Sequence, residues 1–139
     1  MRLELITLLG EKLNETVYEV MLPTQDGDIA VFPGHEALVS LARPGVLGVR
    51  RSKGDADSKI EYFAITGGVI EVTSERVRVL VDAADTGADI SETQSKSAYD
   101  AAVKLRDQAA SQVELEKALQ MVEHQAARLR VAELHRRHR

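Results

Sequence analysis

The stretch that decides the fold is residues 60–81, IEYFAITGGVIEVTSERVRVLV. Apolar and β-branched residues recur there at every second position in three short runs, residues 60–66, 69–73 and 77–81. The pairs Gly67-Gly68 and Ser74-Glu75 separate the runs and are typical of turns or bulges. A period of two with turns this close together predicts neighbouring antiparallel strands.

Working towards the N-terminus, the same pattern continues. Five more runs are expected to be strands, and they cover residues 3–9, 17–22, 29–32, 38–41 and 46–51. Turn signals separate them at Asp26-Gly27, Pro33-Gly34 and Pro44-Gly45, and a polar loop follows at residues 52–58. Many short strands at this spacing favour a sandwich or a flattened barrel, in which two faces supply the core.

The composition changes at about Ala83 to Ala, Gln, Glu and Lys, and the apolar spacing changes from two to between three and four. Ser91 with Gln94, and Ser111 with Glu114, match the capping-box pattern that starts a helix. We therefore predict a mainly β domain over residues 1–88, followed by a two-helix hairpin over residues 89–139.

The two predicted helices carry apolar stripes of different strength. The stripe on the first helix is small and consists of Ala98, Ala102, Leu105 and Ala109. The stripe on the second steps by four and three in the manner of a coiled coil and consists of Leu115, Leu119, Val122, Ala126 and Leu129. Because the first helix can bury little area, we expect the hairpin to dock weakly and to be able to move.

Length and composition exclude several classes of protein. A chain of 139 residues fits one domain with a small appendage. The absence of cysteine excludes disulfides, thiolate metal sites and a cysteine nucleophile, and it fits a reducing compartment. No signal-peptide pattern begins the sequence, and no apolar run reaches the roughly 18 residues of a membrane-spanning helix. We expect contact with a membrane only through partners.

The charge is uneven along the chain. The net charge is −4, yet residues 128–139 hold five arginines and one glutamate, a formal charge of +4. This basic tip is too small for general nucleic-acid binding and suits an acidic protein surface. An equal alternative is a solvated helix end stabilised by its own dipole.

The residue patterns give little sign of catalysis or of metal binding. No phosphate-binding loop has the standard spacing, and the histidines lack a third ligand at metal-site spacing. Asp82, Asp85 and Asp89 lack the spacing of a calcium loop and are interpreted as a solvated hinge. His35 beside Glu36 leaves open an independent sandwich that binds a ligand or acts as an enzyme, although no nucleophile lies nearby and a binding or turn-stabilising role is favoured.

One segment has a specific resemblance. Residues 22–38, LPTQDGDIAVFPGHEAL, resemble the "GEhGhhPGHAPL" signature of the epsilon subunit of F-type ATP synthases. Residues 43–46, 63–72 and 77–82 are similar to later strands of that family in the same order, and residues 127–134 are similar to the end of its second helix. The resemblance covers almost the whole chain.

The resemblance implies a ten-stranded β-sandwich with a C-terminal helical hairpin, in a non-catalytic rotor subunit of the central stalk that links the gamma subunit to the c-ring. It implies a peripheral position on the cytoplasmic face of the membrane, or the equivalent organelle side. The residues that it would turn towards the c-ring are Asp26, Gly27, Asp28, Pro33, Gly34 and His35.

The hairpin of this family can fold onto the sandwich or extend into the catalytic head, where it blocks ATP hydrolysis. For the extended state the resemblance implies contacts of Leu115, Leu119 and Val122 with gamma. Acidic segments of the catalytic beta subunits would meet Arg128, Arg130, Arg136 and Arg137.

The chain departs from the family at one motif. Some bacterial members bind ATP through "I/L-D-x-x-R-A" at the start of the first helix, and residues 90–95 stand there as ISETQS. Ser91 and Gln94 replace the Asp and the Arg, so the charge partners of a nucleotide are missing. We expect no ATP binding, and no cofactor or metal.

Overall fold

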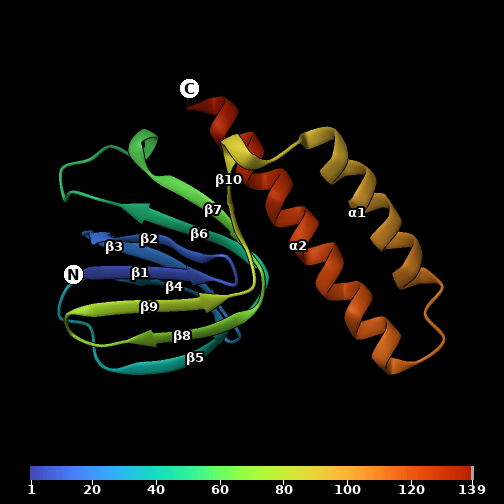
Figure 1. The fold of residues 1–139 in the computed structure, drawn as a ribbon, viewed down its shortest axis with the longest axis horizontal. Coiled ribbons are helices and arrows are strands. Elements are labelled where there is room, and N and C mark those ends of the chain that lie inside the picture. Colours follow the sequence, from blue (N-terminus) through green and yellow to red (C-terminus); the bar gives the residue numbers. More distant parts are fainter. Residues whose placement is uncertain (139) are drawn as a thin grey trace.

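The computed structural model describes residues 1–138, in which ten strands precede two helices (Figure 1). The predicted class, a β-sandwich followed by a helical hairpin, is confirmed. The strands are β1 (Arg2–Thr7), β2 (Gly10–Thr16), β3 (Glu19–Thr24), β4 (Gly27–Val31), β5 (Leu38–Ala42), β6 (Gly45–Arg50), β7 (Glu61–Ile65), β8 (Gly68–Val72), β9 (Arg76–Val81) and β10 (Ala84–Thr86). The helices are α1 (Glu92–Asp107) and α2 (Gln112–Arg137), and two short 3-10 helices, η1 (Asp57–Lys59) and η2 (Gly87–Asp89), lie in the connections.

Strand β3 joins the two layers of the sandwich. The strands follow the order β10-β7-β6-β3-β5-β8-β9-β1-β2, with β4 paired to β3 off this path. The first half of β3 pairs with β6, whereas its last residue, Thr24, pairs with Ala42 of β5. One continuous ladder thus folds over on itself, and its two inner faces enclose the core.

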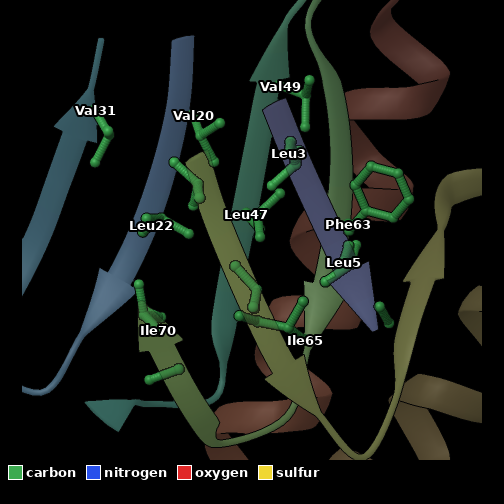
Figure 2. Packing of buried hydrophobic residues seen from close by; sticks show 14 of the residues in the cluster. Leu3, Leu5, Val20, Leu22, Val31, Leu47, Val49, Phe63, Ile65 and Ile70 are labelled. Atoms are coloured by element: carbon green, nitrogen blue, oxygen red, sulfur yellow. The ribbon is translucent and has the colours of Figure 1, made fainter. Parts of the chain in front are cut away.

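The core is filled by the inward positions of the period-two pattern. Leu3 and Leu5 of β1 lie opposite Val77 and Val79 of the parallel strand β9, and all four side chains are fully buried. Figure 2 shows these leucines in one cluster with Phe63 and side chains from the facing strands. Burying a side chain of this size contributes about 1.5–3 kcal/mol, so the sandwich holds most of the stability of the chain.

Two strands, β2 and β10, were not predicted from the sequence. Within β2 the part-buried apolar residue is Leu13, because this strand pairs with β1 along the end of the sheet path and its other residues face solvent. β10 has three residues and pairs with β7 through Ala84 and Ile65. Leu9, expected in the first strand, is fully exposed in the turn after β1, where Gly10 has a φ of 115°.

Both helices begin where the sequence predicts. The Ser91 hydroxyl accepts a hydrogen bond from the Gln94 backbone N–H, and the Ser111 hydroxyl accepts one from the Glu114 N–H. In the capping box at Ser111, the Glu114 carboxylate accepts a hydrogen bond from the N–H of Ala110, one residue before the N-cap residue Ser111.

The hairpin lies against one side of the sandwich, with α2 between the strands and α1 (Figure 1). Its apolar contact with the strands is small and centres on Ala64 of β7 with Ala127 and Val131 of α2; the part-buried residues packed against this group are Val46, Tyr62 and Ile90. This group is called the docking patch below.

The predicted seam of α2 is wrong in part. Leu119 and Ala126 are exposed, whereas the buried residues of α2 are Ala118, Ala127, Val131 and Ala132. The strands and α1 both contact α2, and these two contacts, not a single leucine stripe, decide which positions are buried; the small side chains there allow close approach. On α1, Ala102 is buried as expected, but Leu105 is exposed.

Candidate functional site

The first candidate surface is the turn between β3 and β4. Gly27 has a φ of 123°, a conformation that favours glycine, and the Thr24 hydroxyl closes the turn by donating to the Gly27 carbonyl at 2.5 Å. The exposed Asp28 carboxylate accepts from the Arg43 guanidinium at 2.5 Å. Asp28 also lines a groove together with Arg130 of α2, so this end of the sandwich lies beside the docked hairpin.

The Pro33-Gly34-His35 loop lies at the other end of β4. The Gly34 N–H donates to the Ser74 carbonyl at 2.9 Å, which ties the loop to the turn between β8 and β9. The Nδ1 atom of His35 donates to the Glu36 carbonyl at 2.6 Å, a turn-stabilising contact. A strand of five residues is about 15 Å long, so the structure does not bring this loop and the Asp26–Asp28 turn together.

A second surface was missed in the sequence. Leu41, Val69, Leu80 and Ile6 lie side by side in register across β5, β8, β9 and β1. Leu41 is 53% exposed and Leu80 is 38% exposed, although both lie within strands. The turn beyond β1 adds Leu8 and Leu9, both strongly exposed. We call these six residues the apolar face.

The sequence held a signal for the apolar face. Leu80 stands between Val79 and Val81, and Ile6 follows Leu5, so the alternation fails there and both sides of the strand are apolar. Contiguous exposed apolar residues on a folded domain mark an interaction surface.

The third surface is the basic end of α2. Each of its four predicted contact arginines has a carboxylate partner in the docked arrangement. Arg128 is tied to Asp85 of β10, Arg136 to Glu92 at 2.5 Å, and Arg130 and Arg137 both to Glu133, at 3.2 and 2.5 Å. The pairs of Arg128 and Arg136 reach out of α2, so leaving the docked position would break one or both of them, whereas the Glu133 pairs would persist.

The apolar residues proposed for the extended hairpin are only partly available. Leu115 and Val122 are half-buried in the docked hairpin, and Leu119 is exposed.

The joint between the domains is more ordered than a solvated hinge, which corrects that interpretation. Asp85 lies in β10 and pairs with Arg128. The Asp89 carboxylate accepts from the Thr86 N–H and from the Lys12 ammonium, each at 3.0 Å, and these two donors lower the pKa of Asp89.

A histidine that the sequence gave no reason to single out lies under the hairpin. The Nε2 atom of His124, on α2, is buried and has no hydrogen-bond partner. Burial lowers the pKa of His124, and the nearby Arg128 cation lowers it further, while Asp85 opposes the change. The ring lines a groove between α2 and the sandwich.

The positions of the nucleotide motif have structural roles. Ser91 caps α1, and the buried Ser95 hydroxyl accepts from Nε of Arg128 at 3.3 Å. Among residues 1–138 no three or more His, Asp or Glu side chains converge in a way that could hold a metal ion. Over the same residues no helix is both long and apolar enough to cross a membrane.

The sequence of this chain is similar to that of a known protein family. A family model described as "ATP synthase, Delta/Epsilon chain, beta-sandwich domain" matches residues 1–87. An ATP synthase epsilon chain of Prochlorococcus marinus is 36% identical over 134 residues, which cover 92% of this chain and 96% of the relative. The epsilon chain of Herminiimonas arsenicoxydans is 33% identical over 98 residues, 70% of this chain and 68% of the relative.

Solved structures show the same fold. A chain in the cryo-EM structure of the Euglena gracilis mitochondrial ATP synthase, OSCP/F1/c-ring, has a TM-score of 0.77 at 23% identity, covering 94% of this chain and 79% of that one. A chain in the central stalk/c-ring structure of the Tetrahymena thermophila enzyme has a TM-score of 0.54 at 14% identity, covering 100% and 96%.

Proposed function

This chain belongs to the ATP synthase delta/epsilon family, and on that premise we propose which of its surfaces contact which partners. It is a non-catalytic rotor subunit of the rotary ATP synthase. The observation that carries this conclusion is 36% identity to an epsilon chain over 92% of the sequence. The alternative of a free-standing enzyme built on His35 lacks support, since His35 Nδ1 is engaged with the next residue's carbonyl.

The apolar face is our candidate for the contact with the gamma subunit. It combines in-register side chains on four strands with the exposed turn at Leu8 and Leu9, and a stiff, close-packed sandwich can transmit torque from such a face. Replacing Leu80 with Asp should weaken assembly with gamma. The matched control is Leu105→Asp, which puts the same charge on an exposed leucine of the hairpin and should leave assembly unchanged.

The c-ring contact is assigned to the two ends of β4. Within the described residues β4 has one strand neighbour, β3, so its free edge can lie along a flat surface and touch it with the Asp26–Asp28 turn at one end and the Pro33–His35 loop at the other. The chain has no cysteine, so Asp28→Cys and His35→Cys are unique crosslinking sites. We expect both to capture the ring subunit. Capture of only gamma or beta chains from Asp28 would refute this assignment.

The hairpin is assigned a regulatory role. We place the subunit peripherally on the cytoplasmic face of the membrane, or the equivalent organelle side, where α2 could leave the docking patch and extend towards the catalytic beta subunits. The small docking patch supports this, because it limits how strongly the hairpin is held, and the arginines already have carboxylate partners that other acidic groups could replace. Acidic segments would replace Asp85 and Glu92 as partners of Arg128 and Arg136.

The test is ATP hydrolysis by the assembled complex at low and at moderate salt. Four forms are compared: the full chain, a chain without residues 89–139, the four-arginine variant (R128A, R130A, R136A and R137A), and a three-arginine variant that keeps Arg128 and its Asp85 pair. We expect faster hydrolysis in the three altered forms and a smaller difference at moderate salt, since salt screens wet ion pairs. Equal rates in all forms would refute the brake and leave the rotor role intact.

A further inference from the structure

His124 occupies an unusual position for a polar side chain. It lies on α2 four residues before Arg128 and lines the groove between this helix and the sandwich. Its Nε2 atom is buried without a hydrogen-bond partner. The groove exists only while α2 lies on the sandwich, so undocking would return the imidazole to water.

The charged groups around this ring come from three elements. Arg128 and Lys117 lie on α2, Asp85 on β10, and Asp82 at the connection between β9 and β10. The Asp85 carboxylate is engaged by Arg128, whose guanidinium also donates to Ser95 of α1. A proton added to His124 would therefore meet an adjacent cation and a carboxylate that already has a partner.

We propose that His124 makes the docking of the hairpin sensitive to pH, so that protonation of its ring loosens the Arg128–Asp85 attachment and releases α2 from the sandwich. Desolvation is the main cause, because the charged imidazole loses hydration in the groove. Arg128 lies one turn away on the same helix and repels the charged ring in both states, but this repulsion is stronger when docking removes the screening water. Any consequence for ATP hydrolysis rests on the hairpin role proposed above, but the release itself does not.

The direction of the pH effect follows from the two states of the ring. In the undocked hairpin the imidazole is solvated and has its ordinary pKa of about 6.5. In the docked hairpin burial and Arg128 lower the pKa. Docking therefore has its full strength above about pH 6.5 and weakens as the pH falls below that value. For one histidine the change is limited to about tenfold at pH 5.5.

The experiment measures docking in the isolated full-length chain. Since the chain has no cysteine, Lys53→Cys on the sandwich and Lys104→Cys on α1 provide two exposed labelling sites for a distance measurement. Between pH 7.5 and pH 5.5 we expect the ratio of docked to undocked molecules to fall by up to about tenfold. Over this range circular dichroism should show an unchanged β signal, because release of the hairpin leaves the core of the sandwich in place.

Two variants make the test specific. His124→Gln should remove the pH response, because the amide does not titrate. His138→Gln, at the exposed end of the same helix, should keep it. A full response in His124→Gln would overturn the proposal, and so would tighter docking at pH 5.5, which would mean that Asp82 or Asp85 captures the protonated ring. These distances do not depend on hydrolysis, so failure here leaves the brake standing, and failure of the brake leaves this result standing.

Discussion

The sandwich and the hairpin are held by different means. The sandwich core consists of large side chains with almost no exposure, such as Leu5, Phe63 and Ile65, drawn from both layers. The docking patch that joins the hairpin to it centres on two alanines and one valine. Because burial energy scales with apolar area, the first contact is strong and the second is weak. This difference is what the proposed release of the hairpin from a stiff sandwich requires.

Ion pairs occur both within the sandwich and across the joint. Arg50 pairs with Glu19 at 2.9 Å within the sandwich, where both side chains are largely buried. The ties across the joint are Arg128–Asp85 and Lys12–Asp89, and the second pair is substantially exposed. Exposed ion pairs contribute little and respond to salt, so we expect salt to weaken the Lys12–Asp89 pair more than the partly buried Arg128–Asp85 pair.

The largest effect is expected in the sandwich core. Phe63→Ala should lower the free energy of unfolding by about 3–5 kcal/mol, because it removes a fully enclosed ring and leaves a cavity. Chemical denaturation measures this loss. Leu105→Ala, on the exposed face of α1, is the control and should cost less than about 1 kcal/mol. Equal losses of unfolding free energy in the two variants would contradict the difference between the strongly packed sandwich and the weakly attached hairpin.

An intermediate effect is expected at Gly87, where η2 touches the last turns of α2. A Cβ added there would lie 2.2 Å from the Cβ of His135, so Gly87→Ala must push the helix away. We expect docking to weaken by about 1–3 kcal/mol, as for other overpacked contacts, with the sandwich unchanged. The control is Gly54→Ala, where nothing lies within 4 Å of the added carbon. Distance measurements on labelled chains distinguish displacement of the hairpin from loss of the fold.

A smaller effect is expected when the hairpin is removed. Residues 1–88 alone should unfold cooperatively, at a cost of about 1–2 kcal/mol relative to the full chain, because deletion uncovers Ala64 and its half-buried neighbours Val46 and Tyr62 but leaves the inner core intact. Circular dichroism during denaturation provides the measurement. A broad transition without cooperativity would show that the helices complete the core and that the proposed domain boundary is wrong.

These contrasts also explain how far the sequence predicted the fold. Eight strands were recognisable because each supplies apolar or β-branched residues to the core between turn signals, as Val77 and Val79 do. β2 was not recognisable, since at the end of the sheet path it needs little beyond Leu13 to pack. The helix starts were predictable because Ser91 and Ser111 satisfy local donors, which depends on nearby sequence alone.

The surfaces were harder to predict because they depend on contacts between distant segments. The apolar face forms only in the strand register that places Leu41 beside Val69 and Val69 beside Leu80. That register cannot be derived from the sequence alone. His124 is one polar residue on a polar helix until α2 is placed on the sandwich beside Asp85. The seam of α2 was wrong in part for the same reason, since the positions that α2 buries depend on where the strands and α1 contact it, and Leu119 lies outside those contacts.

The smallest expected effect is that of ATP on the isolated chain, where we predict no physiologically useful binding. A nucleotide held by the docked hairpin would stabilise docking by mass action, by about 2.7 kcal/mol at a concentration of one hundred times Kd. The chain lacks the groups for this, because Ser91 and Gln94 stand where the family's motif has Asp and Arg, and Arg128 is already engaged by Asp85.

Calorimetry should therefore detect little heat of binding, and millimolar ATP should leave both the unfolding transition and the labelled distances unchanged. Micromolar affinity that is lost when Arg128 and Arg130 are replaced with Ala would contradict this. It would mean that the arginines can exchange their carboxylate partners for phosphate. A nucleotide, as well as pH and salt, would then set how strongly the hairpin is docked on the sandwich.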